Sequence, residues 1–100
     1  MKAVRIHEHG GTDVLLWEEI SDPVIKPDQA LVQIKAAAIN HLDIWVRRGI
    51  PGISLPMILG SDAAGIIKKV GQDISGFTIG DEVVINPLIF CGECEACNNG

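Results

Sequence analysis

The sequence predicts a mainly β domain with one short helix and a metal-binding loop close to residue 100. Short apolar or alternating segments are separated by frequent glycine and proline turns, which is typical of strands. Only one segment carries the signals with which helices start and stop. All three cysteines fall within residues 91–97, at a spacing that suits one metal ion.

The first two strands are expected at 1–6 and 14–20, paired across the turn at Gly10-Gly11. Prolines and aspartates within 21–28 then break the chain. Residues 30–39 alternate between apolar and polar before they become wholly apolar, as in a strand that enters a core.

A further strand is expected at 62–70. Its small residues Ala63, Ala64 and Gly65 permit close approach of a neighbouring backbone. Glycine turns follow, and residues 82–85 form the last expected strand.

The one expected helix lies between Asn40 and Gly49. Asn40 suits the N-cap, Asp43 follows three residues later, and Arg47 and Arg48 occupy the last turn. On local evidence, Asn40 and Asp43 are therefore capping residues, and the two arginines complement the C-terminal end of the helix.

Composition excludes several classes of function. The net charge of −5 argues against a nucleic-acid partner, because phosphate binding needs a basic face. The 47% of hydrophobic residues indicates a globular chain. The first residues turn polar too early for a signal peptide, and no apolar stretch approaches the ~18 residues that span a bilayer. We therefore expect a soluble, cytoplasmic protein with no membrane partner.

Cys91, Cys94 and Cys97 have C-x2-C-x2-C spacing, which lets several thiolates converge on one ion. In a chain without an export signal, such a cluster indicates metal ligands rather than disulfides. Thiolates select zinc or an iron–sulfur cluster over magnesium or calcium. A ferredoxin-type run continues with a fourth cysteine, which would fall immediately after Gly100. Spacing alone therefore leaves zinc and an iron–sulfur cluster open.

Five motifs follow one another along the chain: AAAINHLD (36–43), LPMILGSDAAG (55–65), VG (70–71), GDEVV (80–84) and CGECEAC (91–97). Together they resemble the N-terminal part of the medium-chain dehydrogenase/reductase superfamily, specifically its zinc-binding alcohol dehydrogenase and quinone oxidoreductase-like members. The resemblance covers essentially the whole chain, and it favours zinc over a cluster.

This resemblance implies a GroES-like, partly open β-barrel that carries the catalytic groups. In such enzymes a Rossmann domain that binds NAD(P)H follows. Residues 1–100 would be the N-terminal portion of the catalytic domain, and about 86–100 the start of a structural zinc lobe. The sequence holds neither a G-x-G-x-x-G motif nor a βαβ pattern, so we expect the Rossmann domain to be absent and the 100-residue chain to be inactive alone.

The resemblance also implies how metal would be bound. Cys91, Cys94 and Cys97 match the first three of four ligands to a structural zinc, whose fourth ligand would lie a few residues beyond Gly100. The 100-residue chain would then bind zinc weakly, or water, a buffer anion or a neighbouring chain would complete the fourth position. Zinc titration would show tight binding only in a chain extended by about ten residues.

A catalytic zinc, in contrast, is not expected. Alcohol dehydrogenases have a ligand cysteine where this chain has Asn40 and a ligand histidine where it has Ser61. The hydroxyl that relays the alcohol proton falls at Leu42, which has no proton to give. Quinone oxidoreductase-like members resemble this chain here and lack a catalytic zinc.

The resemblance assigns Asn40 as a hydrogen-bond donor near substrate or nicotinamide, and Asp43 as its organising partner. Trp45 would line the substrate pocket, although a core-facing helix residue is an equal interpretation. His41 would contact cofactor phosphates, or else simply be an exposed residue at the helix start. The expected substrate-side residues are Asn40, Asp43, Trp45, Ser61 and Asp62.

Three functions therefore remain. The first is an NAD(P)H-dependent reductase of a quinone, enone or carbonyl, with a small-molecule substrate and a structural zinc. The second is a zinc-dependent alcohol dehydrogenase with an altered catalytic site. The third is a non-catalytic GroES-like interaction module. For a full-length enzyme the resemblance also implies a homo-oligomer, a dimer or tetramer.

Overall fold

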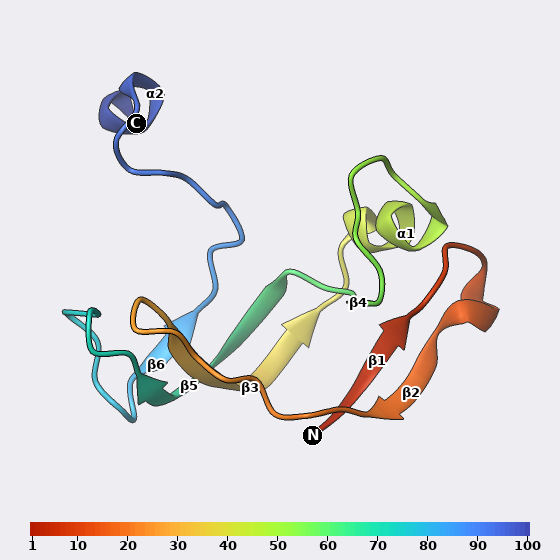
Figure 1. Ribbon diagram of the computed structural model, residues 1–100, viewed down its shortest axis with the longest axis horizontal. Helices are drawn as coiled ribbons and strands as arrows, with labels where there is room; N and C mark the ends of the chain where they lie inside the picture. The colour runs from red at the N-terminus through yellow and green to blue at the C-terminus, as the bar shows by residue number, and fades with distance from the viewer.

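The computed structural model describes all 100 residues and consists mainly of two small antiparallel sheets, which confirms the predicted fold class (Figure 1). The strands are β1 (Lys2–Ile6), β2 (Leu16–Glu19), β3 (Ala30–Ala38), β4 (Met57–Ile58), β5 (Asp62–Val70) and β6 (Glu82–Val84). The helical segments are the 3-10 turn η1 (Thr12–Val14) and the helices α1 (His41–Arg48) and α2 (Glu95–Asn99). Neither helix has the length and apolar content needed to cross a bilayer.

In the first sheet, β1 lies between β2 and β4 and pairs antiparallel with both. The predicted hairpin is confirmed, with Arg5 opposite Leu16. Its second strand begins two residues later than expected because residues 12–14 form η1. Two residues of β1, Ala3 and Ile6, are buried and contribute to the small core.

In the second sheet, β5 lies between β3 and β6, and all three strands are antiparallel. The register pairs Ala30 with Val70 at one end and Ala38 with Asp62 at the other. The ladder is irregular between Ile34 and Ala36, which is the signature of a β-bulge. The bounds of β5 agree with those predicted from sequence.

Close backbone approach in this sheet depends on Gly65. A Cβ atom added there would lie 2.2 Å from the carbonyl oxygen of Gln33 on β3. No side chain fits in that space, so the prediction that small residues let two backbones approach closely is confirmed at this position.

Helix α1 follows β3 directly and begins with a complete capping box. The Leu42 N–H donates to Oδ1 of Asn40 at 3.2 Å, and the Asn40 N–H donates to Oδ2 of Asp43 at 2.8 Å. Gly49 ends the helix at a φ of 110°, a conformation that favours glycine. The predicted start, stop and capping residues of this helix are confirmed.

The fold is open, and its core is small. Only 5 of 100 residues are buried, so the two sheets do not close into a complete barrel. Large apolar side chains remain exposed, among them Trp17 at 66%, Val84 at 82% and Ile89 at 100%. Residues 85–94 run as an arm away from the sheets and carry α2 at their far end (Figure 1).

We expect Gly65→Ala to destabilise the chain by about 3 kcal/mol, because the added methyl group forces β3 and β5 apart. Urea unfolding followed by tryptophan fluorescence measures this change. The neighbouring substitution Ala64→Val points to the opposite face and should stay within ~0.5 kcal/mol of wild type. An equal effect of the two substitutions would contradict the close-approach explanation.

A second prediction concerns the β1–β2 hairpin, where Glu18 accepts from Arg5 Nε at 2.7 Å and contacts His7 Nε2 at 2.9 Å. The hydrogen bonds from His7 and then Arg5 lower the pKa of Glu18 below 4.5. Because the pKa of Glu18 is lower in the folded chain than in the unfolded chain, its carboxylate stabilises the fold at pH values above the unfolded-state pKa. This stabilisation is lost as the pH falls through the folded-state pKa. Glu18→Gln should therefore be less stable than wild type at pH 7.

The difference in folding stability between Glu18→Gln and wild type should decrease as the pH falls below 4.5. Thermal unfolding between about pH 3 and pH 7 measures this convergence. Glu19→Gln is the matched control, since Glu19 has no side-chain partner in the structure and should change little. A difference in melting temperature between Glu18→Gln and wild type that is the same at all pH values would contradict the stabilising role of the Glu18 carboxylate.

Candidate active site and metal centre

Asn40 is the hydrogen-bonding centre of the candidate active site. Its carbonyl oxygen caps α1, and its amide Nδ2 donates to Oδ2 of Asp62 at 3.2 Å. Its backbone N–H donates to Asp43. One residue thus joins the start of α1 to the start of β5. The side chain of Asn40 is held by Asp62, whereas Asp43, its expected organising partner, holds the backbone.

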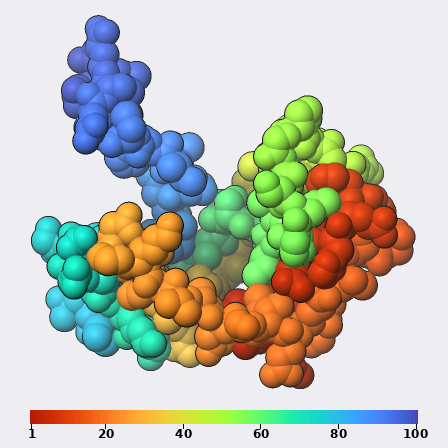
Figure 2. Space-filling view, in the orientation of Figure 1, coloured from red at the N-terminus to blue at the C-terminus, as the bar shows by residue number.

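A cavity of about 680 Å³ opens beside this hydrogen-bond network. Asp43, Ser61 and Asp62 line it, so the structure brings three of the five predicted substrate-side residues to one wall. Most of the remaining wall is apolar, including Ile34, Ile39, Ile44, Ile58, Leu59 and Ile85. In Figure 2 this face is hollowed between the segment around residues 50–60 (green) and the arm (blue).

Trp45 and His41 lie together on the outer side of α1 and not on the cavity wall. Their rings meet edge to face, with centroids 4.8 Å apart and an angle of 73° between the planes. Trp45 remains 52% exposed. The roles predicted for these two residues stay predictions.

The groups at the cavity do not form the ligand set of a catalytic zinc. The cavity wall supplies the Ser61 hydroxyl and two carboxylates. Asn40 lies beside the cavity and does not line it, and its carboxamide oxygen already accepts from the helix N-terminus. Catalytic zinc sites use histidine and cysteine or glutamate around an open position, whereas carboxylate and carbonyl oxygens suit magnesium, calcium or manganese.

The three cysteines, in contrast, are the one group of histidine, cysteine or acidic side chains whose ligand atoms converge. The Sγ atom of Cys97 lies 3.7 Å from that of Cys91 and 3.3 Å from that of Cys94. All three sulfur atoms lie within 4.8 Å of one another. Tetrahedral zinc with Zn–S bonds of about 2.3 Å separates its sulfur ligands by about 3.8 Å. The cluster therefore fits three ligands of a zinc ion.

The cysteine cluster also favours thiolate, the form that binds metal. Hydrogen bonds from the backbone N–H groups of Glu93 and then Cys94 lower the pKa of the Cys91 thiol from 9.0 to about 7. The Cys94 N–H lies 3.3 Å from the Cys91 sulfur. The same turn that aligns the sulfurs thus stabilises negative charge on the first of them.

The cysteine cluster lies far from the candidate active site. Cys94 is the N-cap of α2 and Cys97 lies within it, at the end of the arm and well separated from α1 (Figure 1). The sequence analysis expected only a loop here and missed α2. The acidic residue Glu95 in its first turn was the available signal, but a five-residue helix shows no periodicity.

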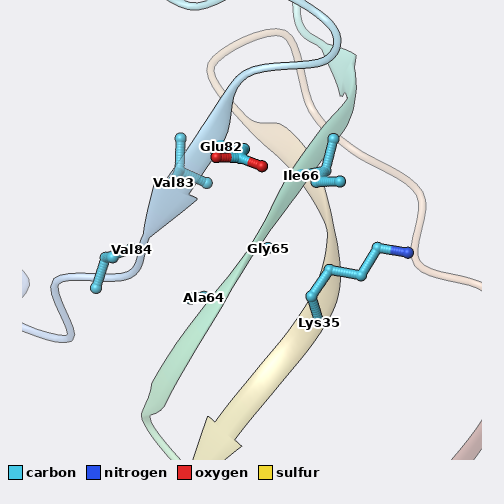
Figure 3. Close-up of a pocket in the computed structure, with 7 residues that line it drawn as sticks. All are labelled: Lys35, Ala64, Gly65, Ile66, Glu82, Val83 and Val84. Atoms are coloured by element: carbon cyan, nitrogen blue, oxygen red, sulfur yellow. The ribbon is translucent and has the colours of Figure 1, made fainter.

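A second, shallower pocket of about 330 Å³ lies on the open face of the β3–β5–β6 sheet (Figure 3). Lys35 and Glu82 rise from strands on either side of β5, and their charged ends do not meet. No predicted site residue lines this pocket, so it offers no convergent chemistry.

Arg47 is the cavity residue whose place the sequence analysis missed. It lines the large cavity, and its Nε atom is shielded from solvent without a hydrogen-bond partner. Its spacing four residues after Asp43 was a usable signal, because such residues share one face of a helix. Asp43 lines the same cavity.

Comparison with known proteins places this site in a family. The model of the alcohol dehydrogenase GroES-like domain matches residues 26–100, three quarters of the chain. The chain belongs to this family. It corresponds to the N-terminal part of medium-chain dehydrogenases/reductases, as the five motifs predicted, and this family comprises oxidoreductases.

Three relatives illustrate the match. A zinc-type alcohol dehydrogenase-like protein of Schizosaccharomyces pombe is 44% identical over 82 residues, covering 79% of this chain and 24% of its own length. A solved NAD-dependent alcohol dehydrogenase superposes with a TM-score of 0.92 at 46% identity, covering 99% of this chain and 29% of its own. The Escherichia coli quinone oxidoreductase complexed with NADPH superposes with a TM-score of 0.79 at 38% identity, covering 84% of this chain and 26% of its own.

These relatives include alcohol dehydrogenases and a quinone oxidoreductase, so similarity shows the oxidoreductase family but not the reaction. The chain spans about a quarter of the length of the relatives it matches. The reaction type therefore depends on the residues of the site.

Replacing any one cysteine of the cluster should weaken zinc binding at least 100-fold, because removing one thiolate leaves two protein ligands. Competition with a chromophoric chelator would measure this for Cys91→Ser, Cys94→Ser and Cys97→Ser. Glu93→Gln, within the same loop but outside the ligand set, is the control and should bind zinc as wild type does. Unchanged zinc affinity in the three serine variants would contradict the assignment.

Proposed function

We propose that these 100 residues are the N-terminal, substrate-binding portion of an NAD(P)H-dependent oxidoreductase that reduces a quinone, enone or carbonyl compound. In this proposal residues 86–100 begin a structural zinc lobe, the reaction needs no catalytic zinc, and the isolated chain is inactive. The observation that carries the proposal is the hydrogen bond from Asn40 to Asp62 at the wall of an apolar cavity.

The chemistry follows from the donors at this wall. Reduction of a carbonyl, enone or quinone places negative charge on the substrate oxygen, and fixed donors aimed at that oxygen stabilise the transition state. Asn40 uses one N–H of its amide on Asp62 and retains a second one. The Ser61 hydroxyl, also on the cavity wall, supplies another donor.

Asp62 and Asp43 act in this proposal as positioning residues, not as donors. An ionised carboxylate only accepts hydrogen bonds, so neither can stabilise a developing oxyanion. Asp62 instead fixes the rotation of the Asn40 amide, while Asp43 fixes its backbone. Their combined effect is to hold the free amide N–H in one orientation, which lowers the cost of reorganisation during reaction.

Bound NAD(P)H would supply the hydride. The described sheets are all antiparallel and contain no βαβ unit, so the dinucleotide site would be formed mainly by a further domain. His41, exposed at the start of α1, is the residue proposed here to contact the cofactor phosphates. The solved quinone oxidoreductase relative, which carries NADPH, supports this choice of cofactor.

A zinc-dependent alcohol dehydrogenase with an altered site is the competing proposal, and the similarity to a solved NAD-dependent alcohol dehydrogenase favours it. Against it, the chain has Asn40 and Ser61 at the positions of two expected zinc ligands, and Leu42 cannot relay a proton. Steady oxidation of primary or secondary alcohols by the complete enzyme would favour this alternative.

Asn40→Ser in the complete enzyme should lower kcat/KM for quinone or enone reduction about 100-fold. Serine caps a helix as well as asparagine does, so stability should change by less than ~0.5 kcal/mol, while the amide that meets Asp62 is lost. Steady-state kinetics with NADPH measure the first effect and thermal unfolding the second. Asn86→Ser, in the arm, is the control, and unchanged kcat/KM in Asn40→Ser would contradict the proposed role.

A further inference from the structure

Arg47 is the cavity's one cation, and it has no partner. No carboxylate oxygen lies within 4.0 Å of its guanidinium nitrogens, and its Nε–H has no acceptor. The Nε atom is also shielded from water. Leaving such a shielded donor unsatisfied is costly. The residue therefore has unused capacity to bind an acceptor.

Unlike Arg47, the two carboxylates of the same cavity accept hydrogen bonds from other groups of the protein. Asp43 receives the backbone N–H of Asn40 at 2.8 Å, and Asp62 receives its amide at 3.2 Å. Asp43 also lies in the first turn of α1, where the helix dipole favours negative charge. Both acids thus have hydrogen-bond donors within the protein, whereas Arg47 is the charged side chain of the cavity that has no hydrogen-bond partner.

Helix geometry separates these groups along the cavity. Asp43 and Arg47 are four residues apart on α1, about 6 Å along its axis. The Asn40–Asp62 hydrogen bond therefore marks one end of the wall, and Arg47 lies about one helical turn further along. A ligand that reaches both positions needs a short apolar spacer between two polar ends.

Helix capping does not explain the position of Arg47. The sequence analysis assigned both arginines of the last turn to the C-terminal end of α1. Arg48 is exposed and suits that role, whereas Arg47 is partly buried and lines the cavity. The backbone carbonyl of Arg47 is occupied separately, because it accepts the Gly10 N–H at 2.9 Å.

We propose that Arg47 selects substrates that carry a carboxylate on an apolar body. Guanidinium and carboxylate form paired, charge-assisted hydrogen bonds, the geometry in which arginine binds most strongly. The apolar wall would take the body of the ligand, and its reducible group would lie near Asn40. The position of the reducible group in this assignment rests on the proposed function. The carboxylate site is inferred from Arg47 and the cavity alone.

Binding of two probes to the 100-residue chain tests the proposal without any variant. Octanoate and octanamide have the same length and differ in the charge of the polar end. Titration followed by backbone ¹H–¹⁵N spectra should show octanoate binding at least 10-fold more tightly, with shifts at α1 and β4. Added salt should reduce this preference. Equal affinity of the two probes would overturn the proposal.

Arg47→Gln should bind octanoate and octanamide equally, while Arg48→Gln, the matched control, should retain the preference for octanoate. Arg47→Lys keeps the positive charge but lacks the paired donors, so it should retain only part of the preference for octanoate. A preference that survives Arg47→Gln would overturn the proposal. If the complete enzyme reduces no quinone, enone or carbonyl, the proposed function fails, and the carboxylate preference of this chain is judged separately.

Discussion

The hydrogen bonds of Asn40 are the constraint on which the candidate site depends. They join the first turn of α1 to the first residue of β5, and Asn40 and Asp62 are twenty-two residues apart in the sequence. This contact is possible only because β3 and β5 pair in a register that sets Ala38 opposite Asp62. The close approach of β5 to β3 at Gly65 in turn keeps that register. Backbone packing in one sheet thereby positions the donors of the cavity.

The candidate metal centre lies in a segment that is not stabilised by packing. The arm has exposed apolar side chains and no core of its own, with Leu88, Ile89 and Phe90 all more than 70% exposed. A metal bound by the three thiolates would supply what packing does not, since ligand bonds would fix a short segment that gains little from burial. The distance of this centre from α1 supports a role in shape rather than in hydride transfer.

Sequence reasoning predicted features whose causes are local. The caps of α1, the bounds of β5 and the cysteine cluster follow from Asn40 and Gly49, from Ala63 to Gly65 and from C-x2-C spacing. It missed the Asn40–Asp62 contact, which depends on strand register, and β4, whose two residues carry no pattern. It did not predict that Arg47 lines the cavity, because helix periodicity does not reveal which face meets the cavity. The family resemblance supplied Asp43 as the partner of Asn40, but the pairing of the strands brings Asp62 to its side chain.

The central claim is that zinc holds the arm and is absent from the Asn40 site. X-ray absorption at the zinc edge of the complete enzyme, combined with metal analysis, tests this most directly. We predict one zinc per subunit in a shell of sulfur ligands only, at about 2.3 Å. A second zinc, or a shell of nitrogen and oxygen ligands that remains when Cys91, Cys94 and Cys97 are replaced by serine, would contradict the claim.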